Sequence, residues 1–197
     1  PVPEYKASDV KPETVIALCL EQYPDLQGAL ASIDVEAGDL VAIAGGYTFS
    51  PESQFNRATQ AKRQPGSSFK PIVYSAALDN GFTAGSILLD SPFVLPSSQG
   101  SKMWRPGNFD GKFLGPILLR TALAKSRNVC TVRVAQQIGL PAIVERARQL
   151  GIPGDIPEVL AVSLGSYEAT PLTMAEAYTA FANHGVHIKP RIIKEIE

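Results

Sequence analysis

Apolar and polar residues follow two different periods along this chain. Residues 29–35 and 40–44 are short apolar runs on either side of a turn, residues 36–39, that contains a glycine. Two such runs around a glycine-containing turn predict an antiparallel β-hairpin, and the glycine pair after residue 44 predicts the end of its second strand. From about Ser67 onward, apolar residues recur every three or four positions, which predicts helices.

Five segments have this helical spacing, and glycines stop several of them. They span residues 72–78, 116–125, 129–138, 142–150 and 173–184. A short helix is also expected over residues 13–23, before Pro24, and residues 188–196 have the pattern of a final strand. Residues 83–115 are rich in Gly, Pro and Ser, which indicates a long ordered loop. Two strands, a large helical block and one late strand make an α+β order whose sheet is incomplete.

The composition is that of a globular domain. The chain has 197 residues, of which 45% are hydrophobic and 19% charged, so it can bury a core and is too apolar for a disordered segment. Its 18 basic residues are balanced by 19 acidic ones, and no nucleic-acid partner is predicted. No apolar run approaches the roughly 20 residues that cross a bilayer. The chain begins at Pro1, so any targeting segment would lie outside it.

The cysteines and histidines do not form a recognisable metal or redox motif. Cys19 and Cys130 are far apart and form no CxxC pair. Cys19 lies in an apolar run, where a free cysteine behaves as a small hydrophobic residue. His184 and His187 have no carboxylate or cysteine beside them in the sequence, so no set of metal ligands is indicated.

The segment Arg63–Lys70 carries the first candidate chemistry. Ser67 and Lys70 are three positions apart, so in the first turn of a helix their side chains share a face. A serine nucleophile needs a base within hydrogen-bond reach, and a lysine amine is such a base only when burial or a nearby cation lowers its pKa. At a helix N-terminus, the free backbone N–H of Ser67 can also point at a developing oxyanion.

The same spacing also fits a purely structural interpretation. In that case Ser67 or Ser68 caps the helix and Lys70 is solvated. Pro71 disfavours helical geometry at Lys70, so both interpretations require the helix to begin at Ser67 or Ser68, where the first N–H groups have no partner within the helix.

A second constellation is Ser126-Arg127-Asn128, between two predicted helices. A hydroxyl and a carboxamide two positions apart can face one cleft, where Ser126 relays a proton and Asn128 holds a substrate amide or the lysine. Taken alone, the segment also fits a plain helix connection in which either residue caps a helix.

Together, these motifs and the segments around them resemble the transpeptidase domain of class A (bifunctional) penicillin-binding proteins. SxxK followed by a serine-containing element is an order known for that group of enzymes. The matching segments are 27–30 (QGAL), 44–46 (AGG), 55–59 (FNRAT), 63–71 (RQPGSSFKP), 104–108 (WRPGN), 122–128 (ALAKSRN), 164–172 (LGSYEATPL), 174–178 (MAEAY) and 181–185 (FANHG). The resemblance implies a penicillin-binding/β-lactamase-like fold, with an antiparallel sheet and a large helical subdomain. Residues 1–26 are then a connection with a short helix, and residues 27–197 are the N-terminal portion of the transpeptidase domain.

The resemblance also implies a chemistry and a setting. Ser67 would attack the terminal D-Ala-D-Ala bond of a peptidoglycan stem peptide, with Lys70 as its base and Ser126 and Asn128 as the SxN element. β-Lactams would acylate the same serine, and no metal or organic cofactor is implied. The parent protein would carry an upstream glycosyltransferase domain and a membrane anchor, with this domain on the periplasmic face of the bacterial inner membrane.

One departure from the family concerns its third motif. Neither Lys-Thr-Gly nor Lys-Ser-Gly occurs in this sequence, and loss of a single oxyanion donor costs on the order of 10²–10³ in rate. We therefore expect this piece alone to be inactive or very weak, and either a second polypeptide piece that completes the sheet or a disordered wall of the cleft. A β-lactam sensor and an inert scaffold stay as alternatives. A β-lactamase is disfavoured because Arg127 replaces the central Asp and no suitable glutamate follows.

Overall fold

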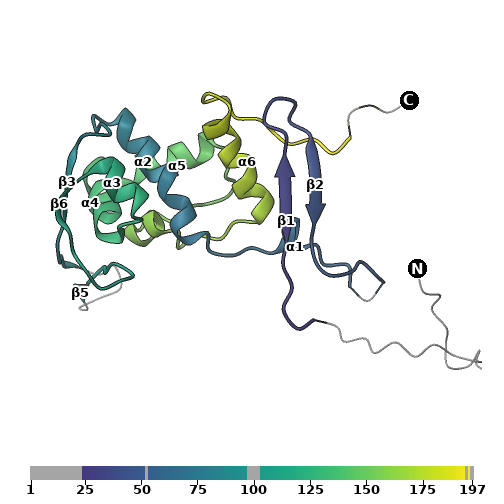
Figure 1. Cartoon of the computed structure of the whole chain (residues 1–197), viewed down its shortest axis with the longest axis horizontal. Coiled ribbons are helices and arrows are strands. Elements are labelled where there is room, and N and C mark those ends of the chain that lie inside the picture. Colours follow the sequence, from purple (N-terminus) through teal and green to yellow (C-terminus); the bar gives the residue numbers. More distant parts are fainter. Residues whose placement is uncertain (1–23, 52, 97–102, 194, 196–197) are drawn as a thin grey trace, which may run out of the picture.

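The computed structural model describes residues 24–51, 53–96, 103–193 and 195. Its strands are β1 (Leu30–Ile33), β2 (Leu40–Ala44), β3 (Ile87–Asp90), β4 (Leu95–Pro96), β5 (Met103–Trp104) and β6 (Gly115–Leu118). Its helices are α1 (Arg57–Gln60), α2 (Lys70–Asp79), α3 (Leu119–Ala124), α4 (Asn128–Ile138), α5 (Leu140–Gln149) and α6 (Pro171–Ala182), with the 3-10 helices η2 (Gly66–Phe69) and η3 (Leu160–Leu164). Figure 1 shows the β1–β2 hairpin at one end and the β3–β6 ribbon on the opposite side of a helical block. The predicted α+β class is confirmed.

The predicted hairpin forms where the two apolar runs flank the turn. β1 and β2 pair antiparallel. In the turn, the Asp34 carboxylate accepts hydrogen bonds from the backbone N–H groups of Glu36 and Ala37, both at 2.9 Å. Gly38 takes a φ of 76°, which a glycine adopts without the steric cost of a Cβ. α6 packs against β1 and joins the hairpin to the helical block.

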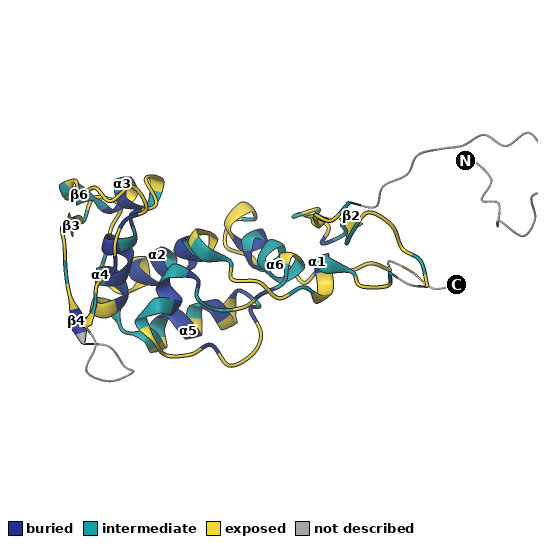
Figure 2. Cartoon of the chain, turned by 90° about the horizontal axis from the view of Figure 1, so that it is seen from below, coloured by how far each residue is buried: buried dark blue, intermediate teal, exposed yellow. Residues whose placement is uncertain are grey.

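α2 is the centre of the helical block and packs against both α4 and α5. Figure 2 shows the buried residues concentrated where these three helices meet. Fully buried members of this core include Phe69, Ile72, Val73, Val134 and Ile143. Burial of side chains of this size stabilises the fold by roughly 1.5–3 kcal/mol each. The packing fixes the first turn of α2, which carries Lys70.

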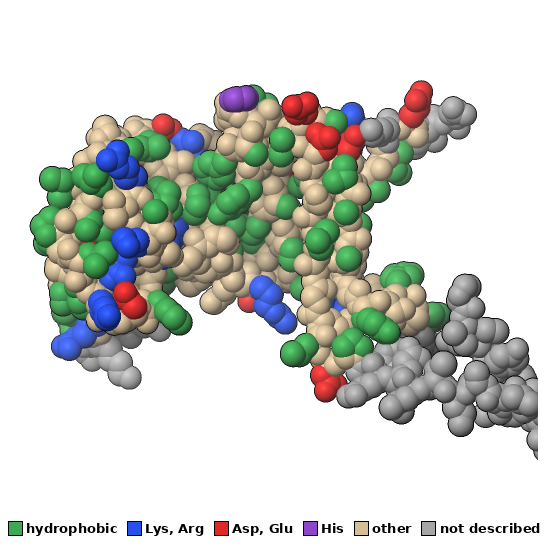
Figure 3. All heavy atoms as spheres, viewed as in Figure 1, with side chains coloured by type: hydrophobic (Ala, Val, Ile, Leu, Met, Phe, Trp, Pro, Cys, Tyr) green, Lys and Arg blue, Asp and Glu red, His purple; other side chains and the backbone are tan. Residues whose placement is uncertain are grey.

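The surface carries charges of both signs. On the face drawn in Figure 3, basic side chains lie mainly over the helical block and acidic ones mainly near the hairpin. Among the helices that the structure describes, none has the length and apolar character needed to cross a membrane.

The prediction for residues 83–118 is partly wrong. The expected loop contains β3, β4 and β5, and the expected helix over residues 116–125 begins only at Leu119, because Gly115–Leu118 form β6. β6 pairs antiparallel with β3, and Ile87 lies opposite Leu118. This pairing joins segments far apart in the sequence, so the local helical spacing of residues 116–118 gave no sign of it.

The predicted final strand is also wrong for the residues that the structure describes. Arg191 forms one isolated parallel bridge with Asp39, in which its N–H and C=O groups bond to the backbone of Gly38 and Leu40. Pro190 lacks an N–H group and cannot extend the ladder. The predicted helix over residues 13–23 and the environment of Cys19 lie outside the described residues.

Candidate active site

The turn that carries Ser67 precedes α2 directly. η2 passes into α2 without a break, and the backbone N–H of Lys70 bonds to the carbonyl of Ser67. Pro71 lies in the first turn of α2, where an absent N–H group costs nothing. η2 begins at Gly66, one residue before the predicted start, and Gly66 itself has a left-handed backbone with φ +56°. Ser67 itself is exposed.

Lys70 is buried rather than solvated. Its residue is only 1% exposed, and its ammonium donates to the Ser126 carbonyl at 2.7 Å, to the Ser126 hydroxyl at 2.9 Å and to Asn128 Oδ1 at 2.6 Å. Three donors thus meet three acceptors, which is the full capacity of an ammonium group. The structure brings together three of the four side chains that the sequence singled out.

The fourth, Ser67, lies one helical turn before Lys70 on the same stretch of chain. Among the residues that the structure describes, its hydroxyl has no hydrogen-bond partner, so a direct contact between Ser67 and Lys70 stays a prediction. Two hydrogen bonds from other parts of the chain hold the turn that carries Ser67. The Tyr178 hydroxyl of α6 donates to the Ser68 carbonyl at 2.7 Å, and the Gly66 N–H bonds to the Gly165 carbonyl.

Ser126 has a backbone conformation that few residues other than glycine adopt. Its φ is +51°. The N–H groups of Ser126 and Arg127 bond to the carbonyls of Leu123 and Ala122, so α3 ends in a Schellman motif with serine at the position that usually holds glycine. Non-glycine residues in this conformation often mark functional sites. Here the serine directs both its carbonyl and its hydroxyl at Lys70.

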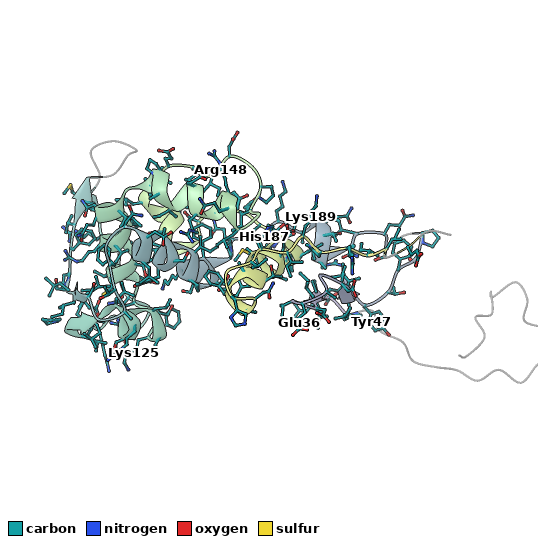
Figure 4. The ribbon with its side chains drawn as sticks, turned by 90° about the horizontal axis from the view of Figure 1, so that it is seen from above. Glu36, Tyr47, Lys125, Arg148, His187 and Lys189 are labelled. Carbon is teal, nitrogen blue, oxygen red and sulfur yellow. The ribbon has the colours of Figure 1, made fainter. Side chains whose placement is uncertain are left out.

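Arg127 separates the two lysine-binding residues and reaches other partners. Its backbone is extended, with φ −72° and ψ 114°, and its side chain bonds to Asp90 and Asp110, whereas Ser126 and Asn128 bond to Lys70. The guanidinium is buried and donates to Asp90 at 2.8 Å and to Asp110 at 2.9 Å. The sequence gave no sign of Asp90, because it lies in the segment expected to be a loop. Lys125, the residue before Ser126, lies at the edge of the helical block in Figure 4.

The electrostatic environment brings the pKa of Lys70 closer to neutral pH. Burial, and after it repulsion from Arg127, lowers the pKa of Lys70 to about 8, while Cys130 acts in the opposite direction. Burial also raises the pKa of the Cys130 thiol to about 11, so this cysteine stays protonated at neutral pH and is not a nucleophile. A base with a pKa near the working pH is the kind that proton transfer requires.

A surface depression of about 560 Å³ lies elsewhere, beside the bridge between Arg63 and Ala169. Lys62, Asp155 and Glu168 contribute charges of both signs to its wall, and none of the four predicted site residues lines it. The chemistry is therefore located by the contacts of Lys70 and not by the shape of this depression.

Comparison with known proteins gives an independent result. A sequence model of the family described as "Penicillin binding protein transpeptidase domain" matches residues 28–197. Penicillin-binding protein 1A of Pseudomonas aeruginosa is 46% identical over 177 residues, which are 89% of this chain and 21% of that protein. The chain thus spans about a fifth of the length of such curated relatives.

Solved structures agree in the fold. Penicillin-binding protein 1A from Haemophilus influenzae superposes with a TM-score of 0.84 at 39% identity, over 90% of this chain and 26% of that one. The PonA1 protein from Mycobacterium tuberculosis, in complex with penicillin V, gives a TM-score of 0.72 at 28% identity, over 84% of this chain and 47% of that one.

Proposed function

Because the chain belongs to the penicillin-binding protein transpeptidase family, we propose that it carries the acylating part of a serine D,D-transpeptidase that cross-links peptidoglycan. The donor would be the terminal D-Ala-D-Ala of a stem peptide, and β-lactams would occupy the same site. The observation that carries the proposal is the buried Lys70 ammonium, bonded to Ser126 and Asn128 one turn after an exposed Ser67. The complex of PonA1 with penicillin V supports the ligand class.

Lys70 is proposed as the base. With a pKa of about 8, about one lysine in ten is neutral at pH 7. Its lone pair takes the proton from Ser67 Oγ as that oxygen forms a bond to the substrate carbonyl carbon. The carbonyl becomes an oxyanion, for which the backbone N–H of Ser67 is one available donor. Lys70 stays charged until the proton moves on.

Ser126 and Asn128 are proposed to complete the first half-reaction. Ser126 contacts Lys70 through its hydroxyl, so it can pass the proton from the lysine to the leaving amine as the C–N bond breaks. Asn128 uses its carbonyl oxygen on Lys70 and its amide nitrogen on the Gly107 carbonyl, and so holds the base in place. The amine of a second stem peptide then attacks the acyl-enzyme and restores Ser67.

The setting follows from the same proposal. Relatives named penicillin-binding protein 1A are several times longer than this chain. We expect a glycosyltransferase domain and a membrane anchor in the parent protein, with the site on the periplasmic side of the bacterial inner membrane. Stem peptides and β-lactams are the expected partners.

Covalent labelling by a fluorescent penicillin tests the proposal. The full-length gene product should be labelled, Ser67→Ala should abolish the label, and Ser68→Ala should retain it, since only Ser67 stands three residues before Lys70. Labelling of Ser67→Ala at the wild-type level would refute the assignment. Rapid release of the acyl group would favour a β-lactamase instead, and stable acylation without cross-linking of stem peptides would favour a sensor.

A further inference from the structure

The Asp90 carboxylate is a buried charge with a complete set of donors. The residue is 0% exposed. One oxygen accepts from Asn108 Nδ2 at 2.8 Å, and the other accepts from Arg127 Nε at 2.8 Å and from the Leu114 N–H at 3.0 Å. A buried ion pair satisfied in this way is costly to break from one side, because the remaining charge loses its partner.

All three guanidinium nitrogens of Arg127 donate hydrogen bonds to β3 or to residues 110–112. Besides Asp90, Arg127 donates to the Asp110 carboxylate at 2.9 Å and to the Lys112 carbonyl. These partners come from β3 and from the segment that leads to β6. The planar guanidinium of arginine has five N–H donors and can bond to partners on several sides, whereas the ammonium group of a lysine has only three donors on one nitrogen.

The same segment is fastened to the start of α4. Asn128 Nδ2 donates to the Gly107 carbonyl at 2.9 Å, and the Val129 N–H donates to Asn108 Oδ1 at 3.3 Å. Residues 107–114 and the first turn of α4 therefore form one hydrogen-bonded unit centred on Asp90 and Arg127. Ser126 and Asn128 flank Arg127 and face Lys70 from that unit.

We propose that Arg127, anchored by Asp90, is a positioning residue for acylation, which holds Ser126 and Asn128 in contact with Lys70. Backbone hydrogen bonds at the end of α3 already restrain the left-handed conformation of Ser126, and the Arg127 side chain ties the residue that follows it to β3 and to residues 110–112. The inference deepens the proposed function and rests on it for the acylation readout.

The guanidinium has a second effect through its charge. The titratable groups that act on Lys70 are Arg127, which lowers its pKa, and the Cys130 thiol in the first turn of α4, which raises it. Asp90 and Asp110 lie on the other side of Arg127 and partly neutralise it. Removal of the guanidinium therefore favours a proton on Lys70, and the fraction of neutral base at pH 7 falls.

Two substitutions separate the charge of Arg127 from its geometry. Arg127→Met removes both, while Arg127→Lys keeps the charge and loses the hydrogen-bond geometry of the planar guanidinium. Arg146→Met is the matched control, since Arg146 forms an ion pair with Asp79 on the surface, where the two side chains are 24% and 65% exposed. Each variant of the full-length gene product is measured for its rate of acylation by a fluorescent penicillin from pH 6 to 9, a range chosen around the titration of Lys70. Lys70 is titrated independently by NMR of ¹³Cε-labelled lysine.

The expected results differ between the variants. Arg127→Met acylates on the order of 10- to 100-fold more slowly. The acid limb of its acylation profile, the pH range in which the rate rises as Lys70 loses its proton, moves to higher pH, and so does the midpoint of the Lys70 titration. Arg127→Lys also acylates more slowly, but its acid limb stays near that of the wild type. Arg146→Met matches the wild type in all three measurements.

Wild-type acylation rates in both Arg127 variants would overturn the positioning role. An unchanged Lys70 titration in Arg127→Met would overturn the effect of charge, and the NMR titration decides this even if the wild type is not acylated at all. Absence of wild-type labelling refutes the proposed function and not the contact between Arg127 and the lysine site. If Arg127→Met does not fold, Arg127→Lys still tests the geometry.

Discussion

The Lys70 ammonium lies 2.9 Å from the Ser126 hydroxyl, although 56 positions separate the two residues. α2 supplies the lysine, and the connection between α3 and α4 supplies the serine. Each of the two short motifs is common in unrelated proteins, but a buried amine bonded to the other motif is the arrangement that a base requires. This contact makes the two motifs one site.

Replacement of Lys70 tests its role as a base. Lys70→Arg keeps a positive charge that cannot be removed near neutral pH, so we expect acylation by a fluorescent penicillin to fall by about 10²–10⁴-fold. Lys70→Met should lose as much. The acylation rate and the folded fraction are measured together, and near-normal acylation of folded Lys70→Arg would mean that Lys70 acts only through its charge.

The wild-type rate of acylation should depend on pH through the same group. Because burial lowers the pKa of Lys70 to about 8, the neutral base becomes more abundant as the pH rises, and the rate should rise along a limb with its midpoint near that value. Stopped-flow acylation across this range gives the midpoint. A midpoint near the ordinary lysine value of about 10.4 would show that the amine is not desolvated in solution.

The free energy of unfolding should also depend on pH through the titration of Lys70. Between pH 8 and 10.5, the two pKa values of Lys70 in the folded and unfolded states, the unfolded chain holds a proton that the folded protein has released. The contribution of Lys70 to the free energy of unfolding therefore rises with pH across this window, by roughly 3 kcal/mol, and the cost of the buried charge is fully present below pH 8.

Two neighbouring groups oppose this trend in the intact protein. The pKa values of Cys130 and Tyr74 are raised by burial, so each contributes stability that is lost as the pH rises through its folded-state value. The measurement is therefore the difference in free energy of unfolding between the wild type and Lys70→Met, taken from urea denaturation at several pH values. A difference that does not change from pH 8 to 10.5 would contradict a buried, neutral Lys70.

Asn128 offers a substitution with a predictable sign. Asn128→Asp places a carboxylate at 2.6 Å from the Lys70 ammonium, which stabilises the charged amine and raises its pKa. We expect the acid limb of the acylation profile to move to higher pH. Asn128→Ala should instead lower the rate across all pH values, by on the order of 10²-fold, without that shift. Identical profiles for the two variants would argue against direct contact with the base.

Gly165 supports the turn that carries Ser67. Its φ is +78° and a Cβ at this position would overlap the backbone of Gly66. Gly165→Ala should therefore destabilise the fold by on the order of 1–3 kcal/mol and slow acylation, because the Ser67 turn must shift. Gly85→Ala is the control, since its Cβ would lie 3.8 Å from Thr83 Oγ1, with no positive φ. Equal denaturation midpoints for the two variants would refute the close approach.

Much of the fold could be predicted because it depends on neighbours in the sequence. The hairpin follows from two apolar runs and a turn that contains Gly38, and α4, α5 and α6 lie within a few residues of their predicted ranges. The spacing of Ser67 and Lys70, and of Ser126 and Asn128, is likewise a property of the sequence alone. These features need only local geometry, and the sequence determines that geometry directly.

Tertiary structure alone decided how the site is assembled. The sequence left open whether Lys70 is solvated, and it gave no sign of the left-handed backbone of Ser126 or of the buried pair of Asp90 and Arg127. It also predicted a helix at residues 116–118, where pairing with β3 makes a strand. Each of these features depends on groups that are distant in the chain. Burial, which lowers the pKa of the lysine, exists only once α2, α4 and the segment from β3 to β6 have packed together.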